Sequence, residues 1–117
     1  MSDLMLTIDT RAPGTAVVFM QGSADIAGHD YFKSEMAKAH ADPAKNVVLD
    51  IRQLNFLTSL AVGEMIALAK VKKAAGGRVV IAGPNHYVLG VFEKARIGSV
   101  IPVYDTVEEA IAAVKHS

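Results

Sequence analysis

The chain has 117 residues, a length that fits one domain spanning 1–117 and is too short for two. Of these residues 51% are hydrophobic and 21% are charged, a composition that fits a globular protein. Its 12 basic residues balance its 12 acidic ones, which argues against the clustered positive charge of a nucleic-acid-binding protein. Cysteine is absent, which excludes disulfides, thiolate metal sites and cysteine nucleophiles.

The N-terminus lacks the basic region and long apolar run of a signal peptide. No stretch of the sequence approaches the length of a membrane span. We therefore expect a protein of the cytoplasm that does not insert into a membrane.

The first part of the chain predicts a β-hairpin followed by a helix. Apolar and polar residues alternate over 4–9, which is typical of a half-buried strand. Ala12-Pro13-Gly14 predicts a tight turn, because Pro fixes φ and Gly accepts a positive φ. A β-branched and aromatic run at 15–20 predicts the second strand. A polar loop at 21–25 then leads to a helix over 29–41, whose apolar face carries Phe32, Met36 and Ala39.

The rest of the chain alternates strands with helices. A continuous apolar run at 46–51 predicts a central strand covered on both faces. The longest helix is expected over 60–75, with Gly76-Gly77 as its C-cap. The remaining elements are a strand at 78–82, a helix at 86–95, a strand at 99–103 and a final helix that Thr106 caps together with Glu109.

Helices between strands imply crossover connections and therefore parallel strand pairs. The order predicts an α/β fold with a mixed, mostly parallel sheet of about five strands and about four helices. No internal repeat or low-complexity segment interrupts it.

Residues that carry catalysis or bind metals give little signal. His29, His40, His86 and His116 do not stand at metal-ligand spacing, which argues against a metal site. There is no phosphate-cradling glycine loop and no nucleophile elbow. The carboxylates of Asp25, Asp50 and Glu64 could converge at strand ends, although their spacing specifies no acid–base work. We expect no enzyme activity and no cofactor.

The junction between the central strand and the longest helix stands out. Thr58 and Ser59 lie where an N-cap belongs, because a hydroxyl there accepts a hydrogen bond from a free backbone N–H. The same helix start would also tolerate a phosphoserine, which adds about two negative charges. The hydroxyls are thus either helix caps with no other task or candidates for phosphorylation.

The longest helix is apolar nearly all round its cylinder, which leaves two interpretations. In the first, an exposed contact patch consists of Leu60, Ala61, Met65 and Leu68. In the second, the helix is buried between neighbours. At its end, Lys70, Lys72 and Lys73 are expected to form a solvated helix terminus.

These segments together resemble STAS domains, in particular the bacterial anti-sigma-factor antagonists, over nearly the whole chain. The resemblance is carried by Gly22-Ser23-Ala24-Asp25, Val47-Val48-Leu49-Asp50, Phe56-Leu57-Thr58-Ser59 with Gly63, the Lys72-to-Gly77 helix end and Glu108-Glu109-Ala110. In that family the junction reads Asp-Ser-Ser/Thr-Gly, and a kinase phosphorylates the Ser that follows the Asp. Ser59 falls on that position, and Asp25 matches a loop acid that assists kinase recognition. Thr58 stands in place of the motif Asp, and Leu60 and Ala61 replace the second hydroxyl residue and the Gly.

The resemblance implies partner switching in the control of transcription. The unphosphorylated domain would bind a serine kinase that doubles as an anti-sigma factor, phosphorylation would release it, and a phosphatase would reset it. Ser59, with Thr58 as second candidate, would carry the phosphate. The expected partner contacts are Asp25, Thr58, Leu60, Ala61 and Met65.

Two other hypotheses about the function stay open. One is a STAS scaffold or regulatory subunit that is never phosphorylated, in a stress-signalling assembly or beside a lipid-transport ATPase. The other is an enzyme or small-ligand binder that uses Asp25, Asp50 and Glu64. A homodimer is compatible with each of them.

Overall fold

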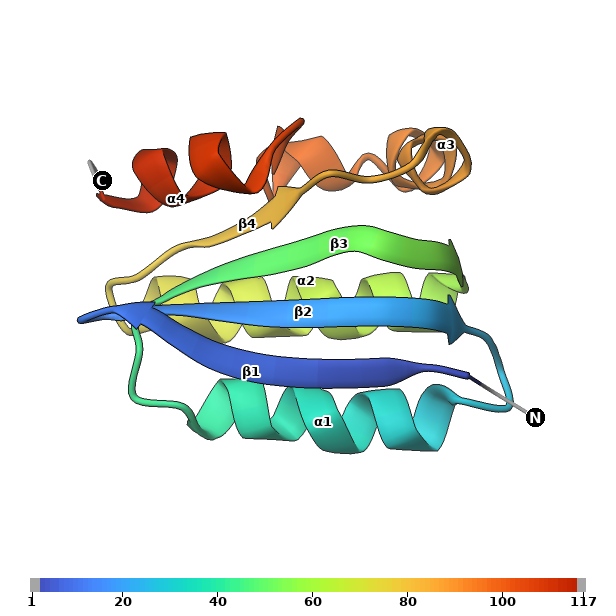
Figure 1. The fold of residues 1–117 in the computed structure, drawn as a ribbon, viewed down its shortest axis with the longest axis horizontal. Coiled ribbons are helices and arrows are strands. Elements are labelled where there is room, and N and C mark those ends of the chain that lie inside the picture. Colours follow the sequence, from blue (N-terminus) through green and yellow to red (C-terminus); the bar gives the residue numbers. More distant parts are fainter. Residues whose placement is uncertain (1–2, 116–117) are drawn as a thin grey trace.

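The computed structural model describes residues 3–115, which form one five-stranded sheet with helices packed on it (Figure 1). The strands lie in the order β1-β2-β3-β4-β5; β1 pairs with β2 antiparallel, and the other pairs are parallel. The strands are β1 (Met5–Ala12), β2 (Thr15–Ala24), β3 (Asn46–Leu57), β4 (Val79–Ala82) and β5 (Val103–Tyr104). The helices are α1 (His29–Ala41), α2 (Ser59–Ala74), α3 (His86–Ala95), the 3-10 turn η1 (Ile97–Ser99) and α4 (Val107–Lys115). The predicted α/β fold with a mixed, mostly parallel sheet is confirmed.

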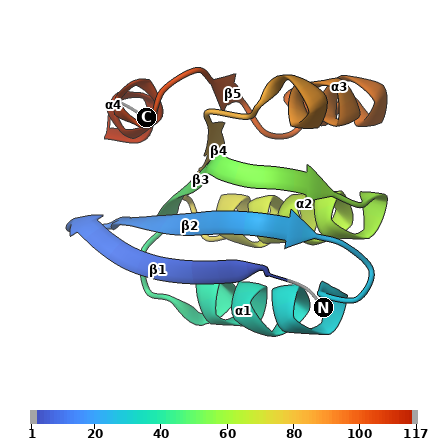
Figure 2. The same ribbon diagram turned by 45° about the vertical axis from the view of Figure 1, so that its right-hand side comes forward.

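The two faces of the sheet carry separate cores because side chains alternate along each strand. On one face, buried side chains of β2, β3 and β4 pack against α1, α2 and α3. On the other face, Val17, Val48 and Val80 lie side by side in register and pack against α4. Figure 2 shows α1 and α2 lying next to each other under the sheet, with α4 well apart from them.

Two strands are longer than their sequence patterns indicate. β2 continues to Ala24 and β3 to Leu57, so most of the loop expected at 21–25 is strand. The two extensions pair with each other through register shifts at Phe19/Gln21 and Gly22/Ser23. Pairing of these backbones, rather than an apolar run, keeps this part of the chain extended.

β3 therefore overhangs β4, because its pairing with β4 covers only Val47–Asp50 of β3. Asn85 ties the overhang to the next helix: its Nδ2 donates to the Leu54 carbonyl at 3.2 Å, and its Oδ1 accepts the Val88 N–H at 2.7 Å. The start of α3 is thereby held beside the end of β3.

The strand expected at 99–103 is mostly wrong. Arg96 ends α3 with a φ of 54°, and η1 follows directly. The N–H groups of Ser99 and Val100 donate to the Arg96 and Ile97 carbonyls, so local helical bonds take the backbone groups that a strand would need. Only Val103–Tyr104 remains as β5.

The end of α2 differs from the expected solvated terminus at one lysine. Lys72 is only 4% exposed, and its Nζ donates to the carbonyls of Asp42 and Ala44, each at 2.8 Å. Lys70 and Lys73 are exposed, as expected. Lys72 thus ties α2 to the loop between α1 and β3, because a long side chain can cross apolar contacts and end on buried acceptors.

Candidate functional site

The two hydroxyl residues at the junction between β3 and α2, Thr58 and Ser59, have different hydrogen bonding. Thr58 is the N-cap of α2, with extended backbone, and its Oγ1 accepts the N–H of Ala61 at 3.3 Å. Ser59 is the first helical residue and is exposed. Its hydroxyl forms no hydrogen bond to any residue within 3–115. The cap is therefore Thr58, and the Ser59 Oγ is exposed and without a hydrogen bond within the described residues.

The first turn of α2 is electrostatically open to an anion. A helix start leaves backbone N–H groups without partners and carries the positive end of the helix dipole. Thr58 takes only the N–H of Ala61, and the first turn holds no acidic residue. A phosphate on Ser59 would therefore meet donors and no fixed negative charge in that turn.

Asp25 begins the loop that lies against this junction. The N–H of Thr58 donates to the Ala24 carbonyl at 3.1 Å, which joins the end of β2 to the start of α2. Asp25 itself is half-buried, and its Oδ1 accepts the N–H of Gly28 at 2.8 Å. Asp25 thus shapes the turn into α1 next to Thr58, and the structure brings these two predicted site residues together.

The expectation of an exposed patch along α2 is wrong for most of its members. Ala61, Met65 and Leu68 are buried in the core between the sheet and the neighbouring helices, so they cannot contact a partner directly. Leu60 is 53% exposed and stays on the surface. A small domain with helices side by side buries a wide face of its central helix, which the apolar sequence of α2 reflects.

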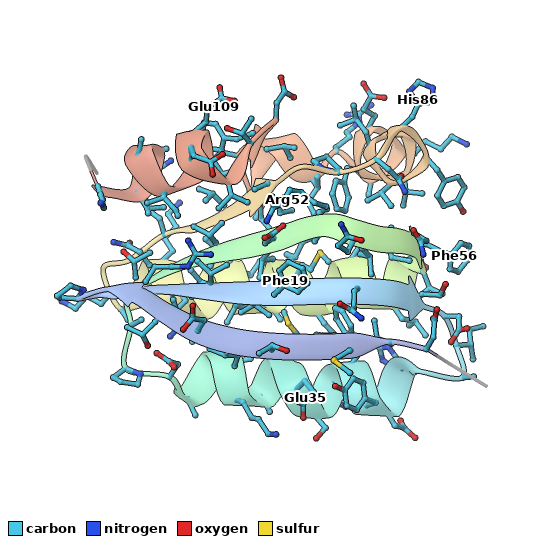
Figure 3. The ribbon with its side chains drawn as sticks, viewed as in Figure 1. Phe19, Glu35, Arg52, Phe56, His86 and Glu109 are labelled. Atoms are coloured by element: carbon cyan, nitrogen blue, oxygen red, sulfur yellow. The ribbon has the colours of Figure 1, made fainter. Side chains whose placement is uncertain are left out.

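The sequence analysis named Leu60 as a partner contact but missed three further exposed apolar side chains at the end of the sheet where α2 begins. Four exposed apolar side chains come from separate segments at this end of the sheet, and we call them the end patch: Ile26, Phe56, Leu60 and Tyr87. The rings of Phe56 and Tyr87 stack with centroids 5.7 Å apart and planes 17° apart. Figure 3 shows Phe56 at the end of β3, with His86 at the start of α3 above it. The available signal was topological, because loops after parallel strands gather at one edge of a sheet.

The three carboxylates considered for acid–base work do not converge at strand ends. Asp50 lies in the middle of β3, is fully buried, and accepts from Arg52 at 3.0 Å (Nε) and 2.9 Å (Nη2). These hydrogen bonds, and next the charge of Asp50, raise the pKa of Arg52. Glu64 lies on α2, half-buried. Asp50 and Arg52 therefore form a structural ion pair.

Within residues 3–115, no group of three or more His, Asp or Glu side chains is placed to hold a metal ion. In the same range, no helix combines the length and the apolar character needed to cross a bilayer. His116 lies outside the described residues.

Comparison with known proteins gives matches along nearly the whole chain. The family model described as STAS domain matches residues 7–110. BtrV of Bordetella bronchiseptica, named as a candidate anti-sigma factor antagonist, is 28% identical over 112 residues, which cover 96% of each chain. The unphosphorylated form of the Bacillus anti-sigma factor antagonist SpoIIAA superposes with a TM-score of 0.79 at 22% identity, covering 97% of this chain and 98% of that one. A sulfate transporter family protein from Wolinella succinogenes shares the fold at a TM-score of 0.74 and 14% identity, with 92% and 90% covered.

Proposed function

The chain belongs to the STAS domain family, and from this membership we propose that it is a cytoplasmic anti-sigma factor antagonist that works by partner switching. In its unphosphorylated form it binds a serine kinase that doubles as an anti-sigma factor. Phosphorylation of Ser59 releases it, and a phosphatase restores the binding form. The antagonist names of BtrV and SpoIIAA support this assignment.

The free hydroxyl of Ser59 is the observation that carries the proposal. Thr58 Oγ1 is occupied as the cap of α2, whereas the Ser59 Oγ is exposed and unbonded within the described chain. In the transfer, the Ser59 Oγ forms a bond to the γ-phosphorus of kinase-bound ATP, the bond to the β–γ bridging oxygen breaks, and the hydroxyl proton passes to a base of the kinase.

The position of the phosphate on Ser59 explains why phosphorylation would release the partner. The end patch comes from segments at the same end of the sheet as Ser59, and a partner that covers Leu60 and the Phe56–Tyr87 stack would bury apolar surface. A phosphoserine adds about two negative charges beside that surface. Burying them without cationic partners is unfavourable, so the complex would dissociate.

Thr58 in place of the family's Asp changes the electrostatics but not the cap. Its hydroxyl still accepts the N–H of Ala61. Without a carboxylate at position 58, the residue directly before Ser59 carries no charge that would repel an incoming phosphate. The same replacement removes a carboxylate that a kinase could recognise. This favours a second candidate function, a STAS scaffold or regulatory subunit that is never phosphorylated.

Incubation with ATP and each kinase-type anti-sigma factor of the source organism separates the two functions. We expect one added phosphate by intact mass, located on Ser59 by peptide mapping, present in Ser34→Ala and absent in Ser59→Ala. Ser34 is a matched control because it is an exposed serine on α1. A stable complex with no phosphate on Ser59 or Thr58 would support the scaffold instead.

The end patch is tested by partner binding. Leu60→Ala should weaken the complex with the unphosphorylated protein, and Val71→Ala should not. Both side chains are exposed and apolar on α2, at 53% and 46%, but Val71 lies toward the other end of the helix. Equal effects of the two variants would remove the end patch from the interface.

A further inference from the structure

The turn between β2 and α1 presents one large apolar side chain to the solvent. Ile26 is 76% exposed, the highest value for any large apolar side chain within residues 3–115. It belongs to neither of the two cores of the sheet. Single exposed apolar side chains are common on proteins, so the position and the rigidity of Ile26 decide whether it has a task.

Hydrogen bonds to Asp25 fix this turn. The Gly28 N–H donates to the Asp25 Oδ1 at 2.8 Å and to the Asp25 carbonyl at 3.1 Å, and the His29 N–H donates to the Ile26 carbonyl at 3.2 Å. A carboxylate that accepts from a nearby backbone N–H stabilises a turn, and a β-branched side chain has few χ1 rotamers. Ile26 is therefore preorganised, which lowers the entropy lost when a partner covers it.

The same turn lies against the start of α2. The Thr58 N–H donates to the Ala24 carbonyl at 3.1 Å, and Asp25 and Ile26 follow Ala24 directly. Figures 1 and 2 both show the connection from β2 to α1 at the end of the sheet where α2 begins. Ile26 is thus presented at the same end of the sheet as Ser59, where the partner of the proposed function would bind.

We propose that Ile26 is an anchor residue that inserts into an apolar pocket of the kinase-type anti-sigma factor, and that Asp25 is a positioning residue that holds the anchor. Binding energy at interfaces concentrates in a few side chains that fill pockets of the partner. The Asp25 Oδ1 is engaged inside the turn, so Asp25 acts through Ile26. The anchor rests on the proposed function for its partner, but it does not require phosphate transfer to Ser59.

The anchor is tested by calorimetric titration of the full chain with each kinase-type anti-sigma factor of the source organism, without ATP. Ile26→Ala removes three carbon atoms from the buried contact and should weaken binding about fiftyfold, whereas Ile26→Val removes one and should weaken it about fourfold. Both variants should keep the Tm of the unaltered protein, because Ile26 lies outside both cores.

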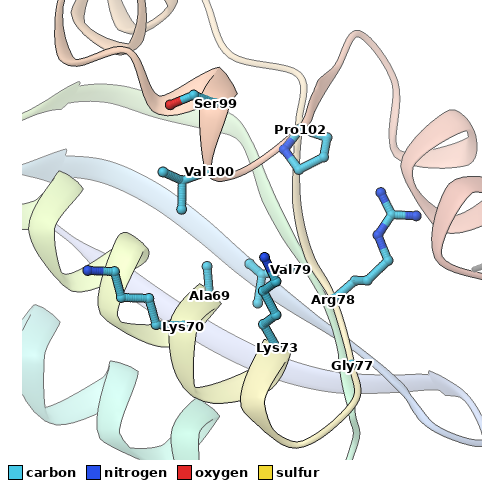
Figure 4. A pocket seen from close by; sticks show the side chains of 9 residues that line it. All are labelled: Ala69, Lys70, Lys73, Gly77, Arg78, Val79, Ser99, Val100 and Pro102. Atoms are coloured by element: carbon cyan, nitrogen blue, oxygen red, sulfur yellow. The ribbon is translucent and has the colours of Figure 1, made fainter.

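Val100 is a matched control for apolar exposure. It is 46% exposed and lies beside a hollow at the second half of α2 (Figure 4). Ala69, which lines the same hollow, is about 15 Å along the helix from Ser59 at 1.5 Å rise per residue. Val100→Ala should therefore leave binding unchanged. A loss for Ile26→Ala no greater than that for Val100→Ala would overturn the anchor.

Two variants of Asp25 test the positioning role. Asp25→Asn keeps an Oδ1 that accepts the Gly28 N–H, so its affinity should stay within about twofold of the original. Asp25→Ala removes this bond and should weaken binding about fivefold, because the turn must then be ordered on binding. Equal losses for the two variants would show that the partner recognises the carboxylate charge itself, which would overturn the positioning role.

Addition of ATP distinguishes the anchor from the proposed function. Ile26→Ala should raise the KM for phosphorylation of Ser59 and leave kcat unchanged. Phosphorylation with the same KM as the unaltered protein would keep the proposed function and overturn the anchor. Binding that depends on Ile26, with no phosphate on Ser59 or Thr58, would keep the anchor and contradict phosphorylation. Binding to none of the anti-sigma factors would overturn both.

Discussion

Replacement of Thr58 by Ala tests which hydroxyl holds the start of α2. The change removes the bond from the Ala61 N–H to Thr58 Oγ1 and leaves that donor without a partner at the helix start. Losing an N-cap costs about 1 kcal/mol of the free energy of unfolding. With an unfolding entropy of roughly 2.1 cal/mol/K per residue over 117 residues, this predicts a fall in Tm of about 4 °C.

Two further variants make this prediction specific. Thr58→Ser keeps the hydroxyl and should retain most of the stability. Ser59→Ala removes a hydroxyl that bonds nothing within the described chain, so its unfolding free energy should stay within about 0.5 kcal/mol of the original. Thermal and urea unfolding followed by circular dichroism measure all three. If Ser59→Ala destabilised as much as Thr58→Ala, the assignment of cap and free hydroxyl would be refuted.

The remaining predictions concern α2 and the residues that follow it. In each case the free energy of unfolding is measured by urea denaturation. Gly63→Ala should stabilise by up to about 1 kcal/mol, because the glycine is inside the helix and an added Cβ meets nothing within 4 Å. Gly77→Ala should cost at least about 2 kcal/mol, because its Cβ would collide with the Lys45 carbonyl. Lys72→Met should cost about 2 kcal/mol by leaving two backbone carbonyls without their charged donor, whereas Lys70→Met, at an exposed position, should stay within about 0.5 kcal/mol. Equal losses for the two lysine variants would contradict the buried bonds of Lys72.

Local signals predicted the helices well. The boundaries expected at 29–41 and 86–95 are those observed, and the final helix begins after Thr106, whose hydroxyl accepts the Glu109 N–H at 3.1 Å. Helix caps and apolar periodicity depend on residues close together in the sequence, so helix boundaries can be predicted from the sequence alone.

Features that depend on distant partners were not predictable in this way. The extension of β3 past Ile51 exists because β2 pairs with it. The buried position of Lys72 depends on carbonyls in the loop before β3. The Phe56–Tyr87 stack joins two strand-to-helix junctions that only the fold brings together. At the candidate site, the sequence placed Thr58 and Ser59 at a helix start, but it could not decide which of them forms the cap.

The overhang of β3 exposes an unpaired strand edge, and a nearby side chain blocks part of this edge. Beyond Asp50, the side of β3 that faces away from β2 has no neighbouring strand among residues 3–115. Such an open edge is a template for strand addition from another molecule. The Asn85 amide occupies the Leu54 carbonyl in the middle of this edge. An incoming strand would have to displace that side chain, and with it the cap of α3. The overhang can therefore carry Phe56 to the end of the sheet without offering a continuous ladder for intermolecular pairing and aggregation.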